Sequence, residues 1–144
     1  MREVLELVEA ALERNDANDV DGFVEYQAPD CDWQTPDGPM HGRDAVREYV
    51  GRFRLAFPDG RHTIDRAVEI GDAVAIEGRW RGTHTGALET PQGELPATGR
   101  TVELPFALIV EADRVIRQAR RVAIYIDHLA ILAQMGLLPE PTAA

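Results

Sequence analysis

The sequence has one cysteine, few positive charges and no long apolar run. With Cys31 alone, the chain cannot form an internal disulfide or a cysteine-based zinc site. Its 15 Lys and Arg residues are outnumbered by 25 Asp and Glu residues, and the net charge is -10. Binding to phosphate backbones depends on cationic side chains, and crossing a bilayer needs about 20 consecutive apolar residues. We therefore expect no nucleic-acid partner and no membrane insertion.

Two common catalytic motifs are also missing. No glycine-rich phosphate loop follows a predicted strand, and no G-x-S-x-G nucleophile elbow is present. Nucleotide use and the usual serine hydrolase chemistry therefore have no support. The N-terminal stretch MREVLELVEAALER is amphipathic rather than typical of a signal peptide, which favours a cytoplasmic location.

The length and composition of the chain fit one domain. With 144 residues, 44% of them hydrophobic, it can bury one sizeable core but not two. We predict a single domain over 1–139 and a short disordered tail at 140–144.

The hydrophobic spacing changes near the middle of the chain, from helical in the first half to alternating in the second. The predicted helices cover 2–14, 20–24, 42–57 and a segment after Asp127, and the predicted long strands cover 61–70, 73–86, 100–111 and 114–126. Helices followed by consecutive strands predict an α+β fold, in which the helices pack on one face of a curved, mostly antiparallel sheet.

One face of the predicted strand 73–86 carries two glycines among large side chains. Alternation places Trp80 and His84 on this face with Gly78 and Gly82. The glycines remove side-chain volume, which indicates a sharp bend or a cavity. Phe106, on the next strand, adds to an apolar wall. The sequence therefore predicts a concave apolar pocket, the usual setting of a small-molecule site.

Alternation alone leaves open which face of the last strand meets the helices. One face holds Ala119, Arg121, Ala123, Tyr125 and Asp127, and the other holds Val122, Ile124 and Ile126. We interpret the first face as the inner one, because small residues beside polar ones are more typical of a pocket lining than of a packed core. The rings of Trp33, Trp80, Phe106 and Tyr125 would then form walls suited to a planar, polycyclic ligand.

Asp127 and His84 each have a catalytic and a structural interpretation. Asp127 is either a base at the rim of an apolar pocket, or the N-cap of the last helix. The two interpretations predict opposite pKa shifts, because desolvation raises the pKa of a carboxyl and amide hydrogen bonds lower it. His84 is either an acid/base or hydrogen-bond donor in the pocket, or a partly buried histidine bonded to a backbone carbonyl.

The remaining histidines do not indicate a metal site. No pair has the H-x-x-x-H spacing that places two imidazoles on one helical face. His62 begins a strand and is expected to face the pocket, whereas His41 and His128 are expected on the surface. Arg121 either pairs with neighbouring carboxylates or steers an anionic group of a substrate.

Several segments in succession resemble one known family. The segments DWQTPDGPMHGRDAV, AFPDGRHTI, GDAVAIEGRWRGTHTG, ATGRTVELP and YIDHLAILAQMGLLP are similar to the signatures of the SnoaL-like polyketide cyclases. The match runs from about Asp30 to Pro139. The resemblance implies the cone-shaped α+β, barrel-like fold shared by nuclear transport factor two, ketosteroid isomerase and scytalone dehydratase, and it also implies a homodimer.

The resemblance implies cofactor-free aldol ring closure of a hydrophobic polyketide-like substrate. The acid/base aspartate carries over to Asp127, the histidine of GTHTG to His84, and the aromatic residue before the aspartate to Tyr125. The chain departs from many relatives at Val122 and Ile126, where an acidic and an aromatic residue are usual. Because the same scaffold hosts several reactions, an isomerase, a dehydratase, an epoxide hydrolase and a non-catalytic ligand-binding or dimerisation module stay open as alternatives.

Overall fold

The computed structural model describes residues 2–138, so the predicted tail at 140–144 lies outside the described residues. The helices are α1 (Glu3–Asp16), α2 (Val20–Val24), α3 (Arg43–Ala56) and α4 (His128–Gln134). The strands are β1 (Gln27–Thr35), β2 (Gly38–His41), β3 (Arg61–Ile70), β4 (Ala73–Thr83), β5 (Leu88–Thr90), β6 (Gly93–Leu95), β7 (Thr101–Asp113) and β8 (Gln118–Ile126). Within residues 2–138, no helix has the length and apolarity that a membrane span requires.

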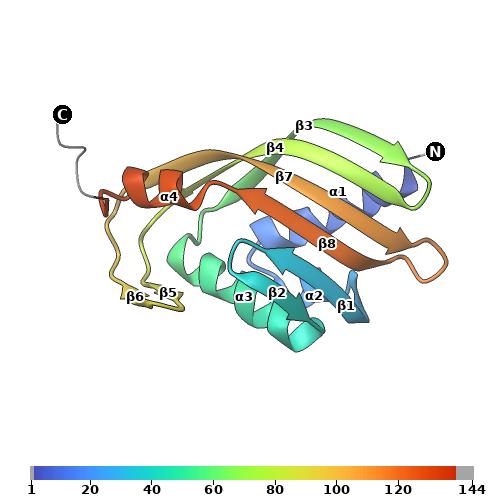
Figure 1. The fold of residues 1–144 in the computed structure, drawn as a ribbon, viewed down its shortest axis with the longest axis horizontal. Coiled ribbons are helices and arrows are strands. Elements are labelled where there is room, and N and C mark those ends of the chain that lie inside the picture. Colours follow the sequence, from blue (N-terminus) through green and yellow to red (C-terminus); the bar gives the residue numbers. More distant parts are fainter. Residues whose placement is uncertain (1, 139–144) are drawn as a thin grey trace.

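Six strands form one curved sheet in the order β2-β1-β8-β7-β4-β3. β1 pairs with β8 in parallel, and the other neighbours in this sheet are antiparallel. The long strands arch across the molecule, and α1, α2 and α3 lie along one face of the sheet (Figure 1). This arrangement confirms the predicted α+β fold with helices packed on a curved, mostly antiparallel sheet.

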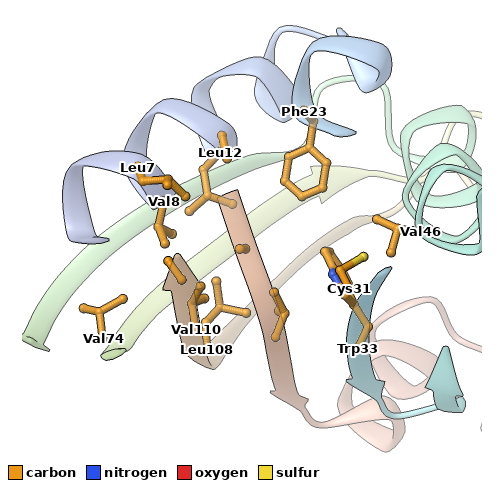
Figure 2. Packing of buried hydrophobic residues seen from close by; sticks show 14 of the residues in the cluster. Leu7, Val8, Leu12, Phe23, Cys31, Trp33, Val46, Val74, Leu108 and Val110 are labelled. Atoms are coloured by element: carbon orange, nitrogen blue, oxygen red, sulfur yellow. The ribbon is translucent and has the colours of Figure 1, made fainter. Parts of the chain in front are cut away.

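The main core lies between α1 and the inner face of the sheet. Figure 2 shows Leu7, Val8 and Leu12 of α1 pointing toward Leu108 and Val110 of β7. These side chains belong to one cluster of buried residues, and they fall at the i, i+1 and i+5 positions of a single helical stripe. The predicted amphipathic helix therefore packs its apolar face on the sheet.

The first turn of α1 is held by a distant side chain. Arg2 at the N-cap position makes no side-chain capping bond. Instead, the backbone N–H of Leu5 donates to Oε1 of Glu69 on β3, at 2.7 Å. A carboxylate near a helix N-terminus is favoured by the helix dipole as well as by the hydrogen bond. The N-terminal end of α1 is thereby fixed to β3.

The glycines of β4 lie against aromatic side chains of β4 itself and of neighbouring segments. A Cβ at Gly78 would lie 2.6 Å from Cζ of Phe106, and a Cβ at Gly82 would lie 2.9 Å from Trp80 and 3.0 Å from Phe57. The predicted inner faces of β4 and β7 are confirmed by their burial. Of the two outcomes predicted for these glycines, a bend or a cavity, the second is wrong beside Gly78 and Gly82, because the side chains of Phe106, Trp80 and Phe57 fill that space.

A bulge in β8 reverses the predicted inner face of that strand. Glu111 pairs with Arg121 but Ala112 pairs with Ala119, so Arg120 is an extra residue in the ladder. One extra residue exchanges the two faces of the strand beyond it. Ala119 is inward as predicted, but beyond the bulge the residues that line the interior are Val122, Ile124 and Ile126. The prediction that Tyr125 and Asp127 face inward is therefore wrong.

The segment Ala87–Thr98 contains the small β5–β6 hairpin. It joins the ends of β4 and β7 and packs near α3, through Leu88. The predicted last strand also begins later than expected. Residues Arg114 to Arg117 form the turn before β8, and Arg117 has a φ of 56°.

Candidate active site

An apolar cavity of about 150 Å³ lies between the helices and the inner face of the sheet. Its aromatic lining residues are Phe23, Trp33, Tyr49, Phe53, Phe57, Trp80 and Phe106. Figure 2 shows Phe23 and Trp33 in this interior, together with the aliphatic side chains of α1 and β7. A cavity of this size in an apolar core holds a molecule about as large as benzene. The volume therefore suits a single ring better than the planar polycyclic ligand expected from the sequence.

Four of the predicted substrate-binding residues line this cavity: Trp33, His62, Trp80 and Phe106. Trp33 is 5% exposed, and its Nε1 donates a hydrogen bond to Oε1 of Gln27 at 3.0 Å. The indole ring is therefore held in place by a buried polar contact. That these residues bind a substrate stays a prediction.

His62 is paired with a carboxylate from α1. Its Nδ1 lies 2.7 Å from Oδ1 of Asp16, and its backbone N–H donates to Oδ2 of the same carboxylate at 3.1 Å. The ring also stacks edge-to-face on Phe106, with centroids 5.5 Å apart. A carboxylate at Nδ1 accepts the proton of that nitrogen, so the lone pair of the neutral ring is on Nε2. This geometry makes Nε2 of His62 a candidate base.

The histidine lies where the cavity meets the surface. His62 and Leu12 line both the apolar cavity and a neighbouring surface pocket that also includes Asp16. The side chains of His62 and Asp16 are 18% and 21% exposed. The pair is thus shielded from most solvent but still within reach of protons from water.

A buried arginine joins the segments that carry the pair. Arg54 of α3 is 7% exposed. Its Nη1 donates to the carbonyl of Gly60 at 2.8 Å, and Nη2 donates to the carbonyls of Pro58 at 2.8 Å and of Asp16 at 3.4 Å. Burial lowers the pKa of Arg54, and the charges of Asp16 and Asp59 oppose that shift. Arg54 therefore fixes the end of α1 relative to the start of β3, where His62 lies.

Tyr49 of α3 lines the same cavity, with its phenol beside the side chain of Thr35. It is 4% exposed, and burial raises the pKa of its phenol, with a further rise from the charge of Asp37. The hydroxyl consequently keeps its proton at neutral pH.

Sequence reasoning missed Asp16, Arg54 and Tyr49. Asp16 lies just beyond the helix predicted over 2–14. A signal was present, because Asp16 follows Leu12 by four residues and so continues the apolar stripe of α1. A polar residue on the buried stripe of a helix has to meet a partner or a ligand.

His84 is fully buried but is not among the residues that line the cavity. Its ring lies against Phe57, with centroids 5.2 Å apart, and its Nδ1 accepts a hydrogen bond from the backbone N–H of Thr98 at 3.2 Å. The expected carbonyl partner is thus replaced by an N–H donor. Burial lowers the pKa of His84, so the neutral ring joins β4 to the segment before β7.

We predict that His84 makes the fold less stable at acidic pH. Its pKa is lower in the folded state than in the unfolded chain, so below about pH 6.5 the unfolded chain binds more protons, and the free energy of unfolding falls by at most about 1.4 kcal/mol per pH unit. The variant His84→Asn keeps an acceptor for Thr98 but cannot be protonated. Urea denaturation between pH 7 and pH 5 should show a smaller loss for the variant. Parallel losses in both proteins would refute this role.

The other predicted site residues lie outside the cavity. Asp127 is exposed, and its Oδ1 accepts the backbone N–H of Ala130 at 3.1 Å, which makes it the N-cap of α4. Tyr125 is 54% exposed, and Arg121 lies 3.9 Å from Glu111 on the sheet surface. The structure brings none of these three side chains to His62. Among the described residues, no three His, Cys, Asp or Glu side chains gather as a metal-binding group.

The comparisons with known proteins agree with this fold. A family model described as a SnoaL-like domain matches residues 8–117. The comparison with curated proteins finds no match.

Solved structures cover nearly all of the chain at low identity. A predicted SnoaL-like polyketide cyclase from Jannaschia sp. CCS1 has a TM-score of 0.81 and 16% identity, covering 95% of this chain and 94% of that one. IdmH, a predicted polyketide cyclase from Streptomyces antibioticus, has a TM-score of 0.73 and 24% identity, covering 92% and 98%. A protein with a ketosteroid isomerase-like fold from Catenulispora acidiphila, in complex with trimethylamine, has a TM-score of 0.76 and 22% identity, covering 92% and 94%.

Proposed function

We propose that this protein, which belongs to the SnoaL-like domain family, is a small-molecule enzyme of the polyketide cyclase type that works by acid/base chemistry. The observation that carries the proposal is the His62–Asp16 pair at the rim of an apolar cavity. The similarity in fold to predicted polyketide cyclases supports it.

In the proposed reaction, Nε2 of His62 removes a proton from a carbon next to a carbonyl group. Asp16 stabilises the imidazolium that forms, and a hydrogen bond from Tyr49 stabilises the enolate oxygen. The enolate carbon then attacks a second carbonyl of the same molecule, and His62 returns the proton to the new alkoxide. Atoms and charge balance without a cofactor. The cavity walls hold the two reacting carbons close together, which lowers the entropic part of the barrier.

The assignment implied by family resemblance competes with this one. It makes Asp127 the acid/base group, with His84 or Tyr125 as the hydrogen-bond donor. For Asp127 to act in the cavity, its carboxylate would have to leave the N–H of Ala130 and turn inward. The His62–Asp16 pair needs no such rearrangement, and we therefore prefer it.

Loss of water from a hydroxy-carbonyl compound is a second candidate reaction. The cavity volume favours it, because a ring-sized substrate fits about 150 Å³ better than a folded polyketide chain does. His62 would take the proton from carbon and deliver it to the departing hydroxyl. Isomerase, epoxide hydrolase and non-catalytic binding roles have no specific observation in their favour.

A substrate that reports both reactions tests the proposal. A short diketone that closes to a six-membered ring gives a hydroxy-ketone by aldol addition and an unsaturated ketone after loss of water. In deuterated buffer, we expect the protein to speed deuterium incorporation at the carbon next to the carbonyl and to release one of the two products, both followed by NMR. Heat-denatured protein is the control. Exchange and product formation no faster than in that control would exclude the proposed chemistry.

We also propose that the protein is a cytoplasmic homodimer that pairs through the outer face of its sheet. Ile109 and Tyr125 are 39% and 54% exposed on β7 and β8. Each lies opposite an alanine of the neighbouring strand, Ala123 and Ala107. Ile109 and Tyr125 therefore expose side chains on the face away from the helices, whereas Ala123 is buried beneath its neighbours.

A further inference from the structure

Asn15 is a buried polar residue without an evident structural role. It lies at the end of α1, beside Asp16 in sequence, and it lines the apolar cavity. The residue is 8% exposed, and among the described residues its Oδ1 has no hydrogen-bond partner. A buried acceptor without a donor costs stability, and such groups are rare in native proteins.

A second asparagine three residues later shows the contrast. The Oδ1 of Asn18 accepts a hydrogen bond from Nε of Arg54 at 2.8 Å, and its Nδ2 donates to the carbonyl of Pro58 at 3.0 Å. Both polar atoms of this amide are therefore hydrogen-bonded, and they connect the loop between α1 and α2 to Arg54 and Pro58. Asn15 instead lines the cavity, where most of the lining is apolar, and its Oδ1 has no such partner among the described residues.

We propose that Asn15 is a specificity-determining residue that recognises a hydrogen-bond donor on the ligand. A hydroxyl or N–H group carried by a ring-sized, otherwise apolar molecule would satisfy Oδ1, and the cavity walls would enclose the ring. Because Asn15 adjoins Asp16, the recognised group lies at the same end of the cavity as His62. The proposal rests on the proposed function only in placing the substrate in this cavity.

This recognition makes hydroxyl-bearing ring compounds the favoured substrate class. A site with a buried acceptor binds a ligand that carries the matching donor better than an analogue without it, because the analogue leaves the acceptor unpaired. Phenol and toluene are a suitable probe pair, since a hydroxyl in one replaces a methyl in the other at nearly equal volume.

The experiment measures the dissociation constants of phenol and toluene by NMR titration of three proteins: the wild type, Asn15→Leu and Asn18→Leu. Leucine has nearly the shape of asparagine but no polar atoms. Dividing the toluene constant by the phenol constant gives a preference, and comparing this preference between proteins cancels the different hydration of the two probes. We expect Asn15→Leu to lower the preference about tenfold and Asn18→Leu to leave it unchanged.

Thermal unfolding separates this role from a structural one. Asn15→Leu should be at least as stable as the wild type, because it removes an unpaired buried acceptor, whereas Asn18→Leu should be less stable. Probe binding by the wild type with the same preference in Asn15→Leu would overturn the inference and leave the proposed function standing. Failure of the wild type to bind either probe would overturn both, since the cavity would then not be a ligand site.

Discussion

Replacing His62 with glutamine should reduce turnover of a cyclisable diketone by about 10²- to 10⁴-fold, the range usual for loss of a general base. Glutamine is polar and of similar size, so the walls around it change little. Its amide nitrogen has no lone pair that can take a proton from carbon. Deuterium exchange at the substrate carbon should fall by the same factor as product formation, because both begin with the same proton transfer.

Asp16→Asn should also reduce turnover, with the histidine still present. The carboxylate accepts the proton of Nδ1 at 2.7 Å and stabilises the imidazolium. An amide that donates to Nδ1 would favour the opposite tautomer and place the proton on Nε2, where it blocks the base. We therefore expect the turnover number to fall more than the apparent substrate affinity.

Asp127→Asn is the matched control, since it changes a carboxylate to an amide outside the cavity. Asparagine is as good an N-cap as aspartate, so α4 should persist and turnover should stay within about twofold of the wild type, a change well below that of losing an acid/base group. Near-normal turnover in His62→Gln together with a large loss in Asp127→Asn would reverse our assignment and support the one implied by the resemblance. Circular dichroism of all three variants shows whether the fold is kept.

Replacing Arg54 with methionine should destabilise the protein by about 3–5 kcal/mol, the range for breaking a buried charged network. The guanidinium donates to Asn18 and to the carbonyls of Asp16, Pro58 and Gly60. Methionine fills much of the same volume but leaves these buried acceptors without donors. Urea denaturation measures the change in the free energy of unfolding.

Two further variants show whether the stabilising effect of Arg54 comes from the geometry of its hydrogen bonds or from its charge. Arg54→Lys keeps the positive charge but cannot reach four acceptors from one planar group, so it should recover only a minor part of the loss. Arg47→Met removes an exposed arginine of the same helix, which pairs with Asp21 and Asp44, and should cost about 1 kcal/mol or less. Equal losses at Arg54 and Arg47 would contradict the proposed anchoring role.

Much of the fold was predictable because its signals are local. The stripe of Leu5, Val8 and Leu12 identified α1, and the alternation through β4 and β7 identified their inner faces. The same alternation placed Trp80 and Phe106 in the interior. Such signals depend only on the periods of helices and strands, so they can be recognised without knowledge of the tertiary structure.

The position of the site depends on contacts between residues that are far apart in the sequence, and part of the site was predicted at the wrong residues. Alternation through β8 is valid only while the ladder is regular, and the extra residue at Arg120 exchanged the faces of all that follow. Asp127 therefore became an exposed cap, in line with its structural interpretation. His62 and Asp16 are 46 residues apart in the chain, and no periodic pattern connects them.

The sequence alone therefore determined which residues are buried on α1, β4 and β7, and through them the class of fold. Only the tertiary structure decided which polar groups meet. Burial follows from the hydrophobic effect, which depends on side-chain area and repeats with the local period. The meeting of His62 with Asp16 depends on how Arg54 fixes the end of α1 to the start of β3, and that contact exists only once the chain has closed around its core.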